Sequence, residues 1–138
     1  MTSVVLDSGI LIASVFPEVL TPQAKRLIRE LQADNTTLHA PTLLRYEAMA
    51  VSRKAVYQGR VTPEEGLRAR DRLLSYPVTL HFDADLIKRG YELATLLNRS
   101  TAYDSQYLAV AERLKCQFWT ADERLFNAVK DHFPGIHW

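Results

Sequence analysis

The chain has 138 residues, of which 47% are hydrophobic and 24% are charged, a length and composition typical of one globular domain, which we expect to span residues 1–138. Its 17 basic and 16 acidic residues nearly cancel, so overall charge does not predict a nucleic-acid-binding protein, and any RNA contact would need locally placed cations. A single cysteine, no leader-like segment after Met1 and no apolar run of about 20 residues predict a cytoplasmic protein without disulfides or membrane spans.

The first 40 residues alternate between strand and helix signals. Residues 3–6 are a short apolar run of the kind that is buried on both faces of a parallel sheet. After Asp7, a second apolar stretch predicts a short helix over residues 10–16. A Thr-Pro pair and one apolar stripe predict a helix over residues 21–35, and residues 37–40 form the second predicted strand.

The middle of the chain continues this alternation. A helix is predicted from Pro41–Thr42 to Gly59. Residues 62–65 combine proline at the first helical position with the S/T-x-x-E capping box, which predicts another helix start. Residues 78–82 alternate like a third strand, and Asp83 can cap a helix that runs to about Leu97.

The last third of the chain adds a helix over residues 102–114, a fourth strand over 117–120, a short helix from Asp122, and a possible edge strand at 136–138. Short strands that alternate with helices indicate βαβ units, which need a parallel sheet covered on both faces. We therefore predict an α/β fold, a three-layer α/β/α sandwich with a mostly parallel central sheet.

Such a fold binds ligands beyond the carboxyl ends of its strands, and four acidic residues are candidates for a site there. Asp7 directly follows the first strand, and Asp122 follows the fourth by two residues. Glu47 lies on the helix after the second strand, and Asp104 starts the helix that leads into the fourth. Singly, each has an ordinary explanation as a helix cap or a surface charge. Together they would repel one another, so the set predicts a bound cation.

Magnesium is the cation that this set favours, because Mg²⁺ prefers oxygen ligands and takes one or two protein carboxylates together with substrate phosphate oxygens. Asp7 and Asp104 are the expected direct ligands. Glu47 and Asp122 would bind through waters, complete a second metal site, or orient the attacking water. The chemistry predicted by this arrangement is phosphodiester hydrolysis.

Four segments of the chain, in this order, carry a resemblance to a known family: residues 4–8, 44–47, 101–112 and 118–125. They resemble the motifs of the PIN-domain nucleases, and most closely those of the VapC-type toxins of bacterial and archaeal toxin–antitoxin pairs. The most specific part is the Tyr-Asp segment at 103–104, followed by Thr-x-Asp at 120–122.

The resemblance implies a PIN-like fold with an acidic pocket, dependence on magnesium or manganese, and endonucleolytic cleavage of RNA. It also implies a homodimer and a cognate antitoxin that occludes the pocket. By position, the three core acids of the family correspond to Asp7, Glu47 and Asp104, and its more variable fourth acid to Asp122. Ser8 and Thr120 fall where the family often has a small or hydroxylated residue, and their hydroxyls have two possible roles: to bind a carboxylate or a metal-bound water, or to cap backbone groups.

Other polar and aromatic residues near the predicted pocket allow two interpretations each. Arg45, Arg99 and Arg124 are possible contacts to RNA phosphates, or ordinary surface charges paired with nearby acids. Tyr103 and Tyr107 lie four residues apart on one helix face, and we expect them to pack in the core or in a dimer contact.

Two alternative functions remain open from the sequence. A nuclease of the same fold that acts on DNA or flap structures would keep the acidic site, but a short chain leaves little room for elements that thread such substrates. A magnesium-binding phosphoacceptor (receiver-like) domain would have adjacent acidic residues early in the chain and a lysine after a late strand. Here Asp7 is followed by serine, and the late strand leads into Thr120-Ala121-Asp122.

Overall fold

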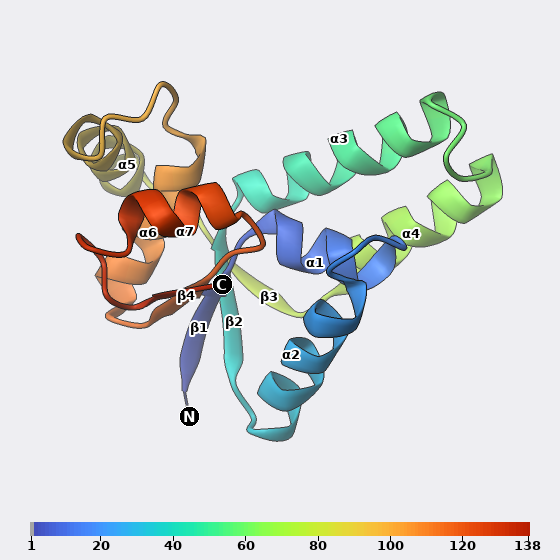
Figure 1. Cartoon of the computed structure of the whole chain (residues 1–138), viewed down its shortest axis with the longest axis horizontal. Helices are drawn as coiled ribbons and strands as arrows, with labels where there is room; N and C mark the ends of the chain where they lie inside the picture. Colours follow the sequence, from blue (N-terminus) through green and yellow to red (C-terminus); the bar gives the residue numbers. More distant parts are fainter. Residues whose placement is uncertain (1) are drawn as a thin grey trace.

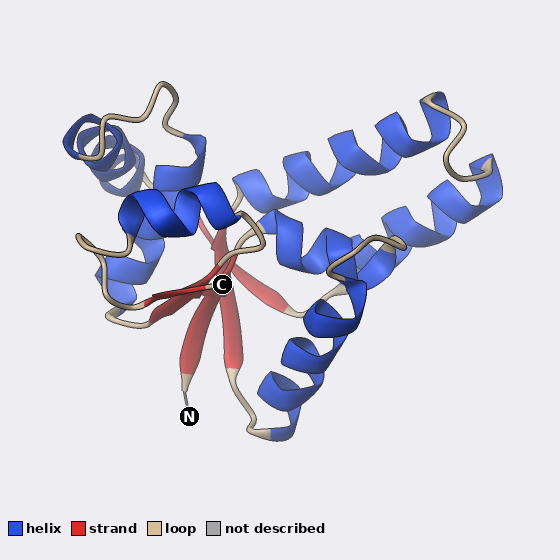
Figure 2. Ribbon diagram, viewed as in Figure 1, coloured by secondary structure: helices blue, strands red, loops and turns tan. Residues whose placement is uncertain are grey.

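A computed structural model of the chain describes residues 2–138. Its centre is a five-stranded sheet in which all neighbouring strands are parallel, in the order β3-β2-β1-β4-β5 (Figure 2). The strands are β1 (Ser3–Leu6), β2 (Thr37–Pro41), β3 (Val78–His81), β4 (Gln117–Trp119) and β5 (Ile136–His137). The predicted parallel α/β architecture is confirmed, and the pairing is parallel throughout the described sheet.

Seven helices cover the sheet in the described part of the chain, with α1–α4 on the right of Figure 1 and α5–α7 on the left. They are α1 (Ser8–Val15), α2 (Thr21–Ala33), α3 (Leu43–Tyr57), α4 (Pro63–Ser75), α5 (Ala84–Leu96), α6 (Tyr103–Leu114) and α7 (Glu123–Val129). The capping box at Thr62 and Glu65 is present, with both hydrogen bonds at 3.1 Å. None of the helices within residues 2–138 combines the length and apolarity needed to cross a bilayer.

The strand order creates a switch point between β1 and β4. From β1 the chain builds outward through β2 to β3, and it then returns to add β4 and β5 on the other side of β1. Loops leave such a point in opposite directions, which opens a crevice at the carboxyl ends of the two strands. Leu6 pairs with Trp119 at these ends, and the N–H of Asp7 donates to the Trp119 carbonyl at 3.1 Å.

The hydrophobic core holds this edge in place. Val4, Val5 and Leu6 of β1 are at most 2% exposed, because helices cover both faces of the central strand. On one face, Tyr107 of α6 stacks against Phe118 of β4, with ring centroids 6.0 Å apart. The residues that follow β1 and β4 therefore start from rigid, buried positions.

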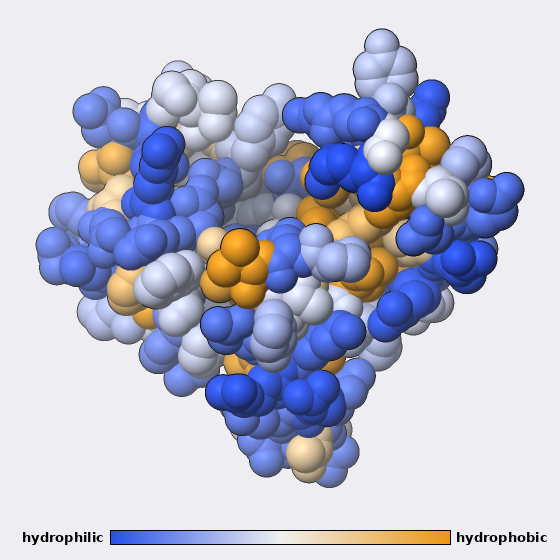
Figure 3. All heavy atoms as spheres, turned by 45° about the vertical axis from the view of Figure 1, so that its right-hand side comes forward, coloured by the Kyte–Doolittle hydropathy of each residue, from blue (hydrophilic) through white to orange (hydrophobic). Residues whose placement is uncertain are grey.

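Helices α3 and α4 form an antiparallel hairpin that extends to the right in Figure 1. Their close approach requires glycine at position 66, because a Cβ atom there would lie 2.3 Å from a methyl carbon of Val56. Met49 and Leu67 line a groove between the two helices. The face of the molecule drawn in Figure 3 is mostly hydrophilic, with an apolar band over the side that carries α3 and α4.

Candidate active site

One cavity of about 500 Å³ opens at the carboxyl ends of β1 and β4. All four acidic residues that the sequence predicts as a set line this cavity, although they come from four separate segments of the chain. The lining also includes Ser8, Tyr107 and Arg124. The fold therefore brings the predicted residues together at the predicted edge of the sheet.

Asp7 occupies the N-cap of α1, directly after β1. Its Oδ1 accepts a hydrogen bond from the N–H of Ile10 at 3.0 Å, which explains why α1 begins two residues earlier than predicted. Its Oδ2 accepts a hydrogen bond from the hydroxyl of Thr120. Burial raises the pKa of Asp7 from 3.8 to about 6, although these two hydrogen bonds oppose the rise.

Thr120 connects two of the acidic residues. Its side chain is 1% exposed, and its hydroxyl donates to Asp7 while it accepts from the N–H of Asp122 at 3.0 Å. Asp122 in turn caps α7, where its Oδ1 accepts from the N–H groups of Arg124 and Leu125 at 3.0 and 3.2 Å. Both interpretations of the threonine hydroxyl are thus present at once, as a contact to a carboxylate and as a bond to the backbone.

Glu47 projects into the cavity from the second turn of α3. Burial raises its pKa, and the charge of Asp104 raises it further, while the hydroxyls of Tyr107 and Ser8 lower it. The phenol of Tyr107 donates to Oε1 of Glu47 at 2.5 Å. The sequence alone assigns Tyr107 only to packing, but its spacing of three from Asp104 on α6, which puts both side chains on one helix face, is a signal for its place in the site.

Asp104 lies in the first turn of α6, where the helix dipole favours a negative charge. Burial raises its pKa, the positive charge of Arg99 lowers it, and the nearby carboxylate of Asp122 raises it again. Asp104 also raises the pKa of both Asp7 and Glu47. Asp104 is therefore close enough to interact electrostatically with each of the other three acids.

The three candidate arginines have different surroundings. Arg124 is exposed and lines the cavity. Arg99 forms an ion pair with Asp104, with 3.5 Å between Nη2 and Oδ2. The guanidinium of Arg45 donates to backbone carbonyls at the end of α4, at 2.6 and 3.2 Å. Arg45 thus satisfies carbonyls at a helix end and links α3 to α4.

The donor set fits a hard divalent cation. Within residues 2–138, no three acidic, histidine or cysteine side chains converge closely enough to enclose one ion by themselves. Magnesium does not require this, because it retains several waters and typically takes one or two protein carboxylates. The cavity supplies carboxylate oxygens whose pKa values are raised by burial and mutual repulsion, and a cation would relieve both effects.

Comparisons with known proteins agree with this geometry. The PIN domain family model matches residues 4–131, which is most of the chain and includes all four acids. The chain belongs to the PIN-domain family. Within this family it is similar to ribonuclease VapC9 of Mycobacterium tuberculosis, with 30% identity over 131 residues that cover 95% of this chain and 94% of that protein.

Solved structures show the same PIN fold. VapC20 of Mycobacterium tuberculosis, described as a sarcin-ricin loop cleaving toxin, matches with a TM-score of 0.67 and 18% identity over 91% of this chain and 94% of that one. A toxin–antitoxin complex from Klebsiella pneumoniae matches with a TM-score of 0.66 and 18% identity over 98% and 96%. The length of this PIN domain is thus close to that of its structural neighbours.

Proposed function

We propose that this PIN domain is a magnesium-dependent endoribonuclease that hydrolyses RNA phosphodiester bonds, with Mn²⁺ as a possible substitute. The observation that supports this most is the meeting of four carboxylates from separate segments in one cavity, where Asp104 interacts with the charges of the other three. The similarity to VapC9, which is named a ribonuclease, favours RNA as the substrate. We place the activity in the cytoplasm, as expected from the single cysteine.

The residues of the cavity divide into three roles. Asp7 and Asp104 would hold the cation, which when bound activates water and neutralises charge on the phosphate. Glu47 is suited to orient the attacking water and to accept its proton, because burial moves its pKa upward from the usual glutamate range. Asp122 and Arg124 are exposed residues of the cavity lining, where the guanidinium of Arg124 can contact an RNA phosphate.

A cleavage assay tests this function. Purified protein is incubated with structured RNA in Mg²⁺ or in EDTA, and single-stranded DNA of matched sequence is treated in parallel. We expect RNA fragments only in Mg²⁺, because a bound cation would relieve the burial and the mutual repulsion of the acids. We expect the DNA to stay intact. RNA cleavage that persists in EDTA would contradict the metal dependence. Cleavage of DNA alone would favour the DNA or flap nuclease alternative. Labelling of Asp7 by acetyl phosphate would favour the receiver-like alternative.

We also propose a cognate antitoxin protein as a partner, which makes this chain the toxin of a toxin–antitoxin pair. The support is the similarity in fold to a structure described as a toxin–antitoxin complex and the sequence similarity to VapC ribonucleases. A bound protein that covers the acidic cavity would keep such a ribonuclease from cleaving RNA of the cell that makes it. A short neighbouring gene for a DNA-binding protein would be its natural source.

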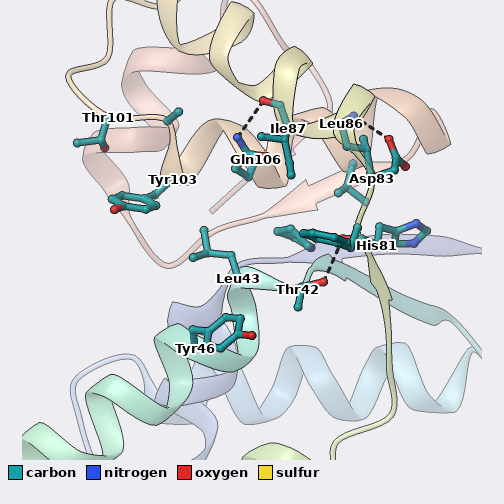
Figure 4. A pocket seen from close by; sticks show the side chains of 14 residues that line it. Thr42, Leu43, Tyr46, His81, Asp83, Leu86, Ile87, Thr101, Tyr103 and Gln106 are labelled. Carbon is teal, nitrogen blue, oxygen red and sulfur yellow. Dashed lines mark hydrogen bonds between the residues drawn. The ribbon is translucent and has the colours of Figure 1, made fainter.

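A homodimer is the other proposed assembly, and an apolar groove of about 800 Å³ beside the acidic cavity offers a surface for it. Figure 4 shows Leu43 and Tyr46 of α3 on one side of the groove and Tyr103 of α6 on the other. Its lining contains no lysine or arginine, and its one acid, Asp83, is paired with Arg113. Such a surface suits the apolar core of a protein interface rather than RNA phosphates.

Phe82→Asp is expected to weaken this dimer. Phe82 lines the groove and is 78% exposed, so a charge there leaves the core intact but would be desolvated in the interface. We expect the dissociation constant of the dimer to rise by about 30-fold, as for loss of a hot-spot aromatic. Light scattering after size-exclusion chromatography measures the molar mass of each variant. Val19→Asp, at an 89% exposed position outside the groove, is the control. An unchanged mass for Phe82→Asp would exclude this surface.

A further inference from the structure

Tyr107 connects the hydrophobic core to the acidic cavity. Its side chain is 2% exposed, and its ring lies nearly parallel to that of Phe118, at an angle of 16° and a centroid distance of 6.0 Å. Its hydroxyl nevertheless reaches the cavity lining, where it donates to Glu47 across 60 residues of sequence. A buried phenol needs a partner for its O–H, and here that partner is one of the four acids.

The hydrogen bond from Tyr107 restricts the orientation of the Glu47 carboxylate. A glutamate side chain has several rotatable bonds, and holding it in one orientation costs conformational entropy. The phenol of Tyr107 is fixed by its packing and occupies Oε1 at 2.5 Å. It therefore favours the orientation of the carboxylate in which Oε1 lies against the phenol. Ser8, which lines the same cavity, carries the other hydroxyl that acts on Glu47.

We propose that Tyr107 is a positioning residue, which holds the carboxylate of Glu47 in the orientation that the reaction uses. The proposal rests on the ribonuclease function proposed above. Tyr107 would not touch the RNA, since its hydroxyl is directed to Glu47 and its ring is buried. Its removal should therefore affect turnover through Glu47 and leave RNA binding unchanged. A purely structural tyrosine would instead affect stability and leave the kinetics of the folded enzyme unchanged.

The variant Tyr107→Phe isolates the hydroxyl, because phenylalanine keeps the ring and its stacking on Phe118. In saturating Mg²⁺ we expect kcat to fall by about 10- to 100-fold, the range typical when a partner of a metal-site residue is removed. KM for RNA should stay within about twofold. The melting temperature should stay within about 5 °C, since one hydrogen bond is lost. Tyr91→Phe, which removes a phenol that is 70% exposed on α5, is the matched control and should behave as the unmodified protein.

A double-mutant cycle shows whether Tyr107 acts through Glu47. Glu47→Gln removes the charge but keeps an oxygen that can accept from the phenol. If the tyrosine works only by orienting the carboxylate, adding Tyr107→Phe to Glu47→Gln should cost less than about twofold more in kcat. Equal losses in both backgrounds would mean that the tyrosine acts independently of Glu47, and this outcome would overturn the proposal.

A readout without RNA or metal comes from proton NMR of the metal-free protein. A phenol proton shared with a carboxylate resonates downfield and is protected from exchange when buried. We expect such a resonance in the unmodified protein, its absence in Tyr107→Phe, and an upfield shift in Glu47→Gln. If the unmodified protein shows no such resonance, or if it is active and Tyr107→Phe has the same kinetics, the positioning role of Tyr107 is refuted and the ribonuclease function is not. Inactivity of the parent protein in Mg²⁺ would instead refute the ribonuclease function.

Discussion

Asp104→Asn is expected to reduce Mg²⁺-dependent RNA cleavage by at least about 10²-fold, a loss typical of removing one electrostatic group from an active site. Asparagine has nearly the same size and is tolerated in the first turn of α6, so the fold should persist. Asparagine lacks the negative charge with which Asp104 interacts with Asp7, Glu47 and Asp122. Initial cleavage rates at saturating Mg²⁺ measure the effect.

The control for this variant is Asp85→Asn. Asp85 is also an acid in the first turn of a helix, α5, but it is exposed and lies outside the acidic cavity. Removing one negative charge there should leave the cleavage rate within about twofold, because an exposed charge outside the site is screened by salt. Equal rates for Asp104→Asn and the unmodified protein would count against the whole acidic site.

Asp7→Asn is expected to abolish cleavage and at the same time to stabilise the metal-free protein near neutral pH. Asparagine is a good N-cap, so the hydrogen bond from Ile10 can be retained. The buried charge is removed, and with it the cost of keeping an ionised carboxylate away from water. The pKa of Asp7 rises from 3.8 to about 6. At about 1.4 kcal/mol per pH unit, this corresponds to a stabilisation on the order of 3 kcal/mol.

The sign of this effect follows from proton linkage. Because the folded pKa of Asp7 lies above the unfolded value, the folded state binds the proton more tightly. The stability that this proton contributes is fully present below pH 3.8 and is lost as pH rises through about 6. The metal-free parent should therefore become less stable over this window, with Glu47 and Asp104 adding slopes of the same sign, since their pKa values are also raised.

Urea unfolding in EDTA, followed from about pH 4 to pH 8 for the parent and Asp7→Asn, measures this difference. The two stability curves should diverge as pH rises, with the variant the more stable at the upper end. Saturating Mg²⁺ should recover stability in the parent more than in the variant, because a ligand stabilises the state that binds it. Parallel curves in EDTA would show that the carboxylate of Asp7 is not desolvated.

Local patterns in the sequence were sufficient for the elements and their order. The apolar run of β1 reads as a buried strand because both of its faces are covered, and the capping box at Thr62 specifies a helix start by hydrogen bonds within four residues. Alternating strands and helices then imply a parallel sheet, and acids that follow strands of such a sheet meet at one edge. Asp7 and Asp122 were predictable for that reason.

The environment of each side chain depended on contacts between distant segments. Tyr103 and Tyr107 have the same residue type and share a helix face, yet one is 61% exposed and the other is buried against Phe118 and bonded to Glu47. Arg45 lies two residues before Glu47, but α4 places carbonyls within its reach and takes it away from the cavity.

The sequence by itself determined the order of strands and helices along the chain, the parallel α/β class and the position of Asp7 and Asp122 at one edge, because these follow from short-range periodicity, capping and strand ends. Only the tertiary structure decided that Thr120 bridges Asp7 and Asp122, that Tyr107 holds Glu47, and that burial raises the pKa of Asp7. The physical reason is that hydrogen bonds and desolvation depend on which groups packing brings within a few ångströms, and these partners lie as far as 113 residues apart in the chain.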